Sequence, residues 1–143
     1  MLTRLYIKDF ALIEESEIEF GPGLNAITGE TGAGKSILIG ALNSILGGPI
    51  SAELVREGAG KCTVEAFFEF ADEQIARLSA LDIPLEELEE GQLILRREIH
   101  SSGRSRAFVN GQGQPVKRLK QIGSALVDLH GQHEHQSLLD PKL

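Results

Sequence analysis

Residues 29–36 constrain this chain more than any other part of its sequence, because they follow the pattern Gly-x-x-x-x-Gly-Lys-Ser/Thr. The glycines let the backbone curl so that its N–H groups point inward at an anion, and a helix starting near the lysine adds the positive end of its dipole there. The lysine then neutralises the β- and γ-phosphates, and the serine hydroxyl is offered to Mg²⁺. We therefore expect a phosphate-binding loop made of Gly29, Glu30, Thr31, Gly32, Ala33, Gly34, Lys35 and Ser36.

The sequence around this loop predicts the order strand, loop, helix that the motif needs. Residues 24–28 are a short and largely apolar run, consistent with a buried strand. After the loop, apolar residues recur on one face of a helix: Ile37, Leu38, Ala41, Leu42, Ile45 and Leu46. Gly47, Gly48 and Pro49 predict the end of that helix. The alternative is a glycine-rich turn with a helix-capping serine that binds no phosphate.

The rest of the chain predicts further strands and helices, and hence an α/β fold. Alternation of apolar and polar residues predicts two strands within residues 2–20, one over 62–70, and a hairpin of 93–99 with 104–109. Residues 72–81 are expected to be helical, 82–91 an exposed connection, and 110–113 a second turn. A helix is expected from Pro115, although residues 125–127 could instead begin a buried strand that ends at Asp128.

Length and composition exclude several classes of protein. The chain has 143 residues, enough for one domain, and 41% of them are hydrophobic, which excludes disorder throughout. Its net charge of −7 is unlike that of most DNA-binding modules, so nucleic-acid contact would need a local patch or another part of the protein. With a single cysteine, Cys62, and no apolar run of membrane-spanning length, we expect a soluble cytoplasmic protein.

Three other groups of residues are candidates for function. Asp128, after the apolar residues 125–127, is a weak match to the carboxylate that supports Mg²⁺ in P-loop enzymes. A histidine-rich tail could hold a metal, but its spacing matches no usual zinc pattern, which favours an exposed loop: His130, His133, Glu134 and His135. Four arginines of the predicted hairpin are expected on a solvated strand face, or alternatively as a patch for the DNA backbone: Arg96, Arg97, Arg104 and Arg106.

Residues 24–36 resemble the opening of the ATPase heads of SMC-like proteins, and residues 7–13 and 128–136 resemble, more narrowly, the RecN family of bacterial DNA repair proteins. The resemblance extends from residue 1 to about residue 141. It implies an α/β P-loop NTPase fold: the N-terminal lobe of an ABC/SMC-type head, with a mixed sheet around the P-loop helix and an antiparallel hairpin. Residues 1–143 would be this lobe, without the coiled coil and the C-terminal lobe that complete such a head.

The same resemblance implies roles for individual residues. Gln132, within a Q-loop at about 130–136, matches the glutamine that reaches Mg²⁺ and the attacking water, so it is expected to be catalytic and, with Ser36, metal-binding. Ile37 is expected beside the nucleotide, and Arg56 resembles an arginine that some SMC-like heads place near nucleotide or DNA.

The implied function is an ATP-binding half-head, with ATP and Mg²⁺ as cofactors, that acts in DNA double-strand break repair and recombination. Its implied partners are its own C-terminal lobe, a second head in a homodimer, and DNA through the assembled protein, in the bacterial cytoplasm at the nucleoid and away from membranes. The segment alone is expected not to hydrolyse ATP. Two alternatives stay open: a small P-loop kinase, with Asp128 on Mg²⁺ and the hairpin arginines as a lid, and an interaction module that needs no nucleotide.

Overall fold

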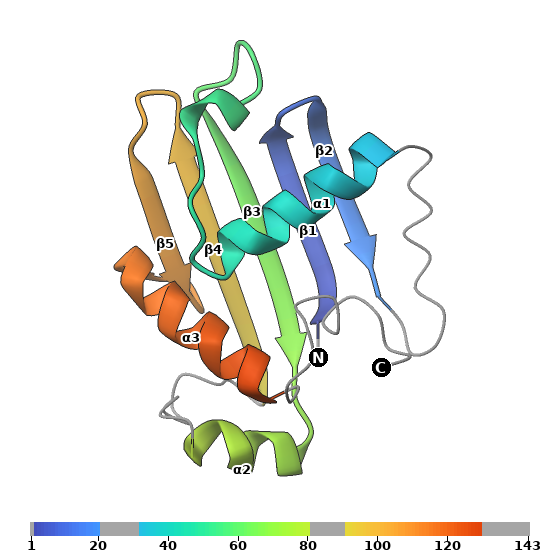
Figure 1. Cartoon of the computed structure of the whole chain (residues 1–143), viewed down its shortest axis with the longest axis vertical. Helices are drawn as coiled ribbons and strands as arrows, with labels where there is room; N and C mark the ends of the chain where they lie inside the picture. The colour runs from blue at the N-terminus through green and yellow to red at the C-terminus, as the bar shows by residue number, and fades with distance from the viewer. Residues whose placement is uncertain (1, 21–31, 81–90, 130–143) are drawn as a thin grey trace.

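The computed structural model describes residues 2–20, 32–80 and 91–129, which form one sheet with helices packed on it. Figure 1 shows helix α1 (Gly32–Ile45) lying across one side of the sheet. Helix α3 (Val116–Leu129) lies on the same side, where it contacts the strand formed by Ser105–Val109. Helix α2 (Asp72–Ala80) lies next to α3 at one end, and a short 3-10 turn, η1 (Ala52–Leu54), follows α1. We call the side of the sheet that α1 and α3 cover the helix face, and the opposite side the outer face.

The described sheet has six strands, ordered β2-β1-β3-β4-β5-β6, and every described pairing in it is antiparallel. The strands are β1 (Leu2–Phe10), β2 (Ile13–Glu19), β3 (Lys61–Glu69), β4 (Gln92–His100), β5 (Ser105–Val109) and β6 (Gln112–Gln114). The predicted hairpin is therefore confirmed as β4–β5. The predicted strand over 24–28 lies outside the described residues, so the described part of the sheet is antiparallel rather than mixed.

Strict alternation builds the core on the helix face. In β3, Cys62, Val64, Ala66 and Phe68 are buried, while the residues between them are partly exposed. Inward-facing residues of β1 and β4 extend this apolar surface, and the apolar stripes of α1 and α3 complete it. The stripe of α3 contains Leu119, Ile122, Ala125 and Leu126, all buried. This period-3.6 pattern is what holds α3 against the sheet.

Two predicted boundaries are wrong. The alternative strand over 125–127 does not form, because Ala125 and Leu126 continue the apolar stripe of α3, and Asp128 lies in that helix instead of at a strand end. The predicted turn over 110–113 is shorter. Asn110, with a φ of 48°, and Gly111, with a φ of 85°, make the reversal, and residue 112 already begins β6.

No helix within residues 2–20, 32–80 and 91–129 is long and apolar enough to cross a membrane. The prediction of strands over 2–20 and 62–70 and of helices over 72–81 and from Pro115 is confirmed to within one or two residues.

Helices α1 and α3 approach so closely that only glycine fits at their contact. A Cβ on Gly123 of α3 would lie 2.7 Å from the carbonyl oxygen of Leu46, at the end of α1. Gly40, in the middle of α1, has no described atom within 4 Å of where its Cβ would be. The two positions therefore form a matched pair for testing how α1 is held.

We predict that Gly123→Ala lowers the free energy of unfolding by about 1–3 kcal/mol, the usual cost of overpacking. Gly40→Ala is the control and should raise it by about 0.5–1 kcal/mol, because alanine favours a helix over glycine. Urea unfolding followed by circular dichroism measures both. A Gly123→Ala variant as stable as the wild type would contradict the close α1–α3 approach.

Candidate nucleotide-binding site

The predicted phosphate-binding loop runs directly into helix α1. Gly32, Ala33, Gly34 and Lys35 are the first four residues of the helix, and Gly29, Glu30 and Thr31 lie outside the described residues. The first four N–H groups of a helix have no partner inside it and carry the positive end of its dipole. No acidic residue stands in the first turn of α1 to neutralise that end. Ser36 is exposed and Ile37 is partly buried.

Burial of one side of α1 places that end of the helix. Leu38, Ala41, Leu42 and Ile45 are buried against the sheet, mainly over β3 and β4. Gly40 and Ile39 are exposed on the other side. The apolar stripe thus holds the helix on the sheet, and the N–H groups of its first turn point along the helix axis toward its start at Gly32.

The other end of α1 is closed by hydrogen bonds to its carbonyl groups. Gly47, with a φ of 93°, reverses the chain, and the N–H of Gly48 donates to the carbonyl of Asn43 at 2.9 Å. Arg97 of β4 reaches the same place from the sheet. Its Nη1 donates to the carbonyl oxygens of Ser44, at 2.8 Å, and Gly48, at 2.5 Å. Sequence reasoning missed this role of Arg97.

Arg56 follows η1 and is bonded to the tip of the β1–β2 hairpin. Its N–H donates to the carbonyl of Asp9 at 2.8 Å, and its Nη1 donates to the carbonyl of Leu12 at 3.3 Å. Asp9 and Ala11 have φ values of 55° and 53°, and Leu12 between the strands is 85% exposed. Residues with strained backbone cluster at functional sites. The contacts of Arg56 with nucleotide or DNA stay a prediction.

No described contact brings the remaining predicted site residues to the start of α1. Gln132 and the histidine-rich tail lie outside the described residues. Asp128 lies in the last turn of α3, so the hypothesis of a strand-end carboxylate for Mg²⁺ is wrong. In residues 2–20, 32–80 and 91–129 there is no cluster of three or more His, Cys, Asp or Glu side chains that could hold a metal.

The four hairpin arginines do not share one face. Neighbouring residues of a strand point to opposite sides, so Arg96 lies on the outer face while Arg97 is buried, 5% exposed, on the helix face. Arg104 and Arg106 are exposed, and Arg106 lies 5.3 Å from the ring of Phe108. The expectation of a single solvated strand face is wrong for Arg97, and no patch contains all four.

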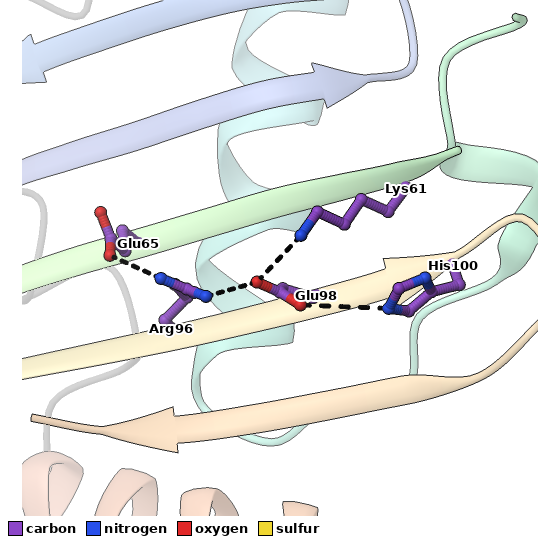
Figure 2. A network of polar contacts seen from close by, with 5 residues as sticks. All are labelled: Lys61, Glu65, Arg96, Glu98 and His100. Atoms are coloured by element: carbon purple, nitrogen blue, oxygen red, sulfur yellow. Dashed lines mark hydrogen bonds and ion pairs between the residues drawn. The ribbon is translucent and has the colours of Figure 1, made fainter. Parts of the chain in front are cut away.

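On the outer face, Arg96 belongs to a network of ion pairs centred on Glu98, which Figure 2 shows. Arg96 Nη2 lies 2.5 Å from Glu98 Oε2 and its Nη1 lies 3.8 Å from Glu65 Oε2. Lys61 Nζ approaches the same oxygen of Glu98 at 3.4 Å, and His100 Nε2 lies 4.0 Å from Oε1. The Arg96 guanidinium also stacks over the ring of Phe108, at 4.5 Å. The cations Arg96 and Lys61 are therefore already paired within the sheet.

The network decides the protonation of Glu98, whose side chain is only 4% exposed. Burial alone would raise the pKa of this carboxyl group. The hydrogen bond and charge of Arg96, together with Lys61, outweigh burial, and the pKa is lowered. Glu98 is thus held as a carboxylate inside the outer face.

Comparison with known proteins supports the predicted family and fold. The family model described as AAA domain matches residues 4–139. DNA repair protein RecN from Vibrio cholerae is 44% identical over 142 residues, which cover 99% of this chain and 25% of that protein. DNA repair protein RecN from Halalkalibacterium halodurans is 45% identical over 141 residues, covering 97% and 24%. The chain therefore spans about a quarter of the length of the curated relatives it matches.

Among solved structures, one described as "Structural biochemistry of ATP-driven dimerization and DNA stimulated activation of SMC ATPases" aligns with a TM-score of 0.72. The alignment covers 96% of this chain and 88% of that chain at 22% identity, so it speaks for the fold alone. That fold is an α/β P-loop NTPase of the SMC-head type, which confirms the predicted class.

The chain belongs to the AAA domain family, and its fold is that of the N-terminal lobe of an SMC-type ATPase head. Within that class, identities of 40–45% to RecN proteins over nearly the whole chain confirm the predicted resemblance to the RecN family.

We predict that Glu98→Gln lowers the free energy of unfolding at neutral pH by about 1–3 kcal/mol, because it leaves Arg96 without its buried carboxylate. A group whose pKa is lowered by folding stabilises the fold above its unfolded pKa, and this contribution is lost as the pH falls through the folded value. The variant should therefore lose less stability than the wild type on acidification. Glu65→Gln is the control and should cost less than about 1 kcal/mol, because this pair is longer and more exposed. Equal acid sensitivity of wild type and Glu98→Gln, by urea titration, would contradict the assignment.

Proposed function

We propose that this chain is the ATP-binding half of an SMC-like ATPase head that acts in DNA double-strand break repair and recombination. The observation that carries the proposal is the placement of the motif. Gly32, Gly34 and Lys35 of the motif lie in the first turn of α1, and the helix is fixed to the sheet along a buried stripe. A triphosphate at that turn would meet free N–H groups, the helix dipole and the lysine together.

Hydrolysis is proposed to need more than this lobe. Gln132 would orient the attacking water and reach Mg²⁺, and Ser36 would offer its hydroxyl to the same ion. The other groups would come from a C-terminal lobe and from a second head, in a homodimer that closes on ATP and thereby holds or tethers DNA. The solved relative named above is described by ATP-driven dimerization and DNA-stimulated activation, which supports this reading. The site of action would be the bacterial cytoplasm, at the nucleoid.

The kinase alternative is not favoured. It required Asp128 at the end of a strand and the hairpin arginines gathered as a lid. Asp128 is in α3, and Arg97 is buried on the helix face, away from Arg96.

The first test is nucleotide binding. We predict that Lys35→Ala weakens binding of a fluorescent ATP analogue with Mg²⁺ by about 10- to 150-fold, because a charge-assisted contact is worth about 1.5–3 kcal/mol. Lys117→Ala, an exposed lysine of α3, is the matched control and should bind like the wild type. If Lys35→Ala and wild type bind equally, or if neither binds, the motif is only a structural turn.

The second test separates binding from hydrolysis. Residues 1–143 alone should show no steady-state ATP turnover, and addition of a C-terminal lobe should restore it. In that complete head, Gln132→Ala should lower the turnover rate by about 10²-fold or more with little change in ATP affinity, as expected for a group that orients water. A fully active Gln132→Ala variant would show that another residue orients the water.

A further inference from the structure

Arg97 is a charged side chain among apolar ones. It is 5% exposed and lies on the helix face of β4, in line with Leu93, Leu95 and Ile99, which are all buried. Burial lowers the pKa of its guanidinium. Burying a cation costs free energy unless its donors are satisfied, so the hydrogen bonds of Arg97 indicate its structural role.

Those bonds join three separate parts of the chain. Nη1 donates to the carbonyls of Ser44 and Gly48, in the last turn of α1 and just beyond it. Nε donates to Oγ of Ser105, the first residue of β5, at 3.0 Å. One rigid planar group thus links the end of α1 to the β4–β5 hairpin.

The end of α1 needs such a partner. The last carbonyls of a helix have no partner inside it and carry the negative end of its dipole. The last turn of α1 contains no basic residue of its own. The cation comes instead from Arg97, 53 residues away from Ser44 in the chain.

We propose that Arg97 is a positioning residue for nucleotide binding, which anchors α1 at its far end and so fixes where the phosphate-binding turn at its near end lies. This inference rests on the proposed function. A helix of 14 residues is a rod about 21 Å long, so a shift at one end is carried to the other. Apolar packing alone is non-directional, whereas hydrogen bonds to the carbonyl of Ser44, in the last turn, and to that of Gly48, just beyond the helix, set the position of this end along the helix axis.

Because the same guanidinium holds Ser105, the hairpin is expected to respond to nucleotide. Binding at the first turn of α1 that reduces motion of the helix should also reduce motion of β5 (Ser105–Val109). The competing explanation is that Arg97 only adds stability to the fold, in which case nucleotide would have no specific effect on β5.

The experiment compares Arg97→Met, Arg97→Lys and the control Arg96→Met in the whole protein that contains this chain. Arg96 is the neighbouring residue on the opposite face, so its variant removes the same group from the same strand. A fluorescent ATP analogue with Mg²⁺ is titrated at a temperature at which circular dichroism shows each variant folded. Hydrogen exchange of residues 46–48 and 105–109 is measured with and without the analogue.

We expect Arg97→Met to weaken the analogue's affinity about five-fold or more and to speed exchange at residues 46–48 without nucleotide. It should also abolish the slowing of exchange at 105–109 that nucleotide causes in the wild type. Arg97→Lys should recover most of the affinity, because an ammonium group can donate to both carbonyls of the α1 end. Arg96→Met loses its contact with Phe108 of β5, so its exchange at 105–109 without nucleotide is expected to be faster. It should still match the wild type in affinity and in exchange at 46–48, and nucleotide should still slow its exchange at 105–109.

Wild-type affinity in a folded Arg97→Met variant, with only a lower melting temperature, would overturn the inference. If Arg97→Met does not fold, Arg97→Gln replaces it with the same expected loss, and wild-type affinity of Arg97→Gln would overturn the inference equally. If the wild type, Arg96→Met and the Arg97 variants all bind the analogue with equal affinity, the inference fails and the proposed function stands. If wild type itself does not bind, the proposed function fails and takes the inference with it.

Discussion

The structure depends on the burial of one stripe of α1 against an antiparallel sheet. Leu38, Ala41, Leu42 and Ile45 meet a surface made by every second residue of β1, β3 and β4. Because the helix repeats every 3.6 residues and the strands every two, each element exposes its other face. The buried stripe fixes how α1 lies on the sheet, and Gly32, Gly34 and Lys35 of the motif stand at the start of that helix. A local motif thus becomes a site only through long-range packing.

Much of this could be predicted from the sequence, because the signals that decide it are local and periodic. Alternation placed β3 and the β4–β5 hairpin, and the repeat of Leu119, Ile122 and Leu126 placed α3. The ambiguous stretch was residues 125–127, where a short apolar run fits a helix or a strand equally well. The longer stripe before it decides the matter, since Ala125 and Leu126 continue the face that α3 already buries. Asp128 then loses the strand-end position that the Mg²⁺ hypothesis required.

The roles of the charged residues could not be predicted in the same way. Arg96 and Arg97 are neighbours of the same type, yet they have different partners. Arg96 forms an ion pair with Glu98 on the outer face, whereas Arg97 donates to a carbonyl group in the last turn of α1. Alternation with Leu93, Leu95 and Ile99 indicated that Arg97 points inward, but no nearby residue in the sequence indicates which groups it bonds to. These are the backbone carbonyls of Ser44 and Gly48, which become acceptors only when α1 ends beside β4. Electrostatic roles follow from the tertiary structure, whereas burial follows from the local pattern.

The proposed division between nucleotide binding in this chain and hydrolysis in a complete head rests on the same physics. Binding of a phosphate needs backbone N–H groups, a dipole and one lysine, and a single strand–loop–helix unit supplies all three. Hydrolysis needs, in addition, a carboxylate for Mg²⁺ and a group that orients water, and these must converge from elements far apart in the chain. Among the described residues no acidic or histidine cluster converges on the start of α1. The proposed phosphate site would therefore depend on how rigidly α1 is held, because that helix carries Gly32, Gly34 and Lys35 at its start.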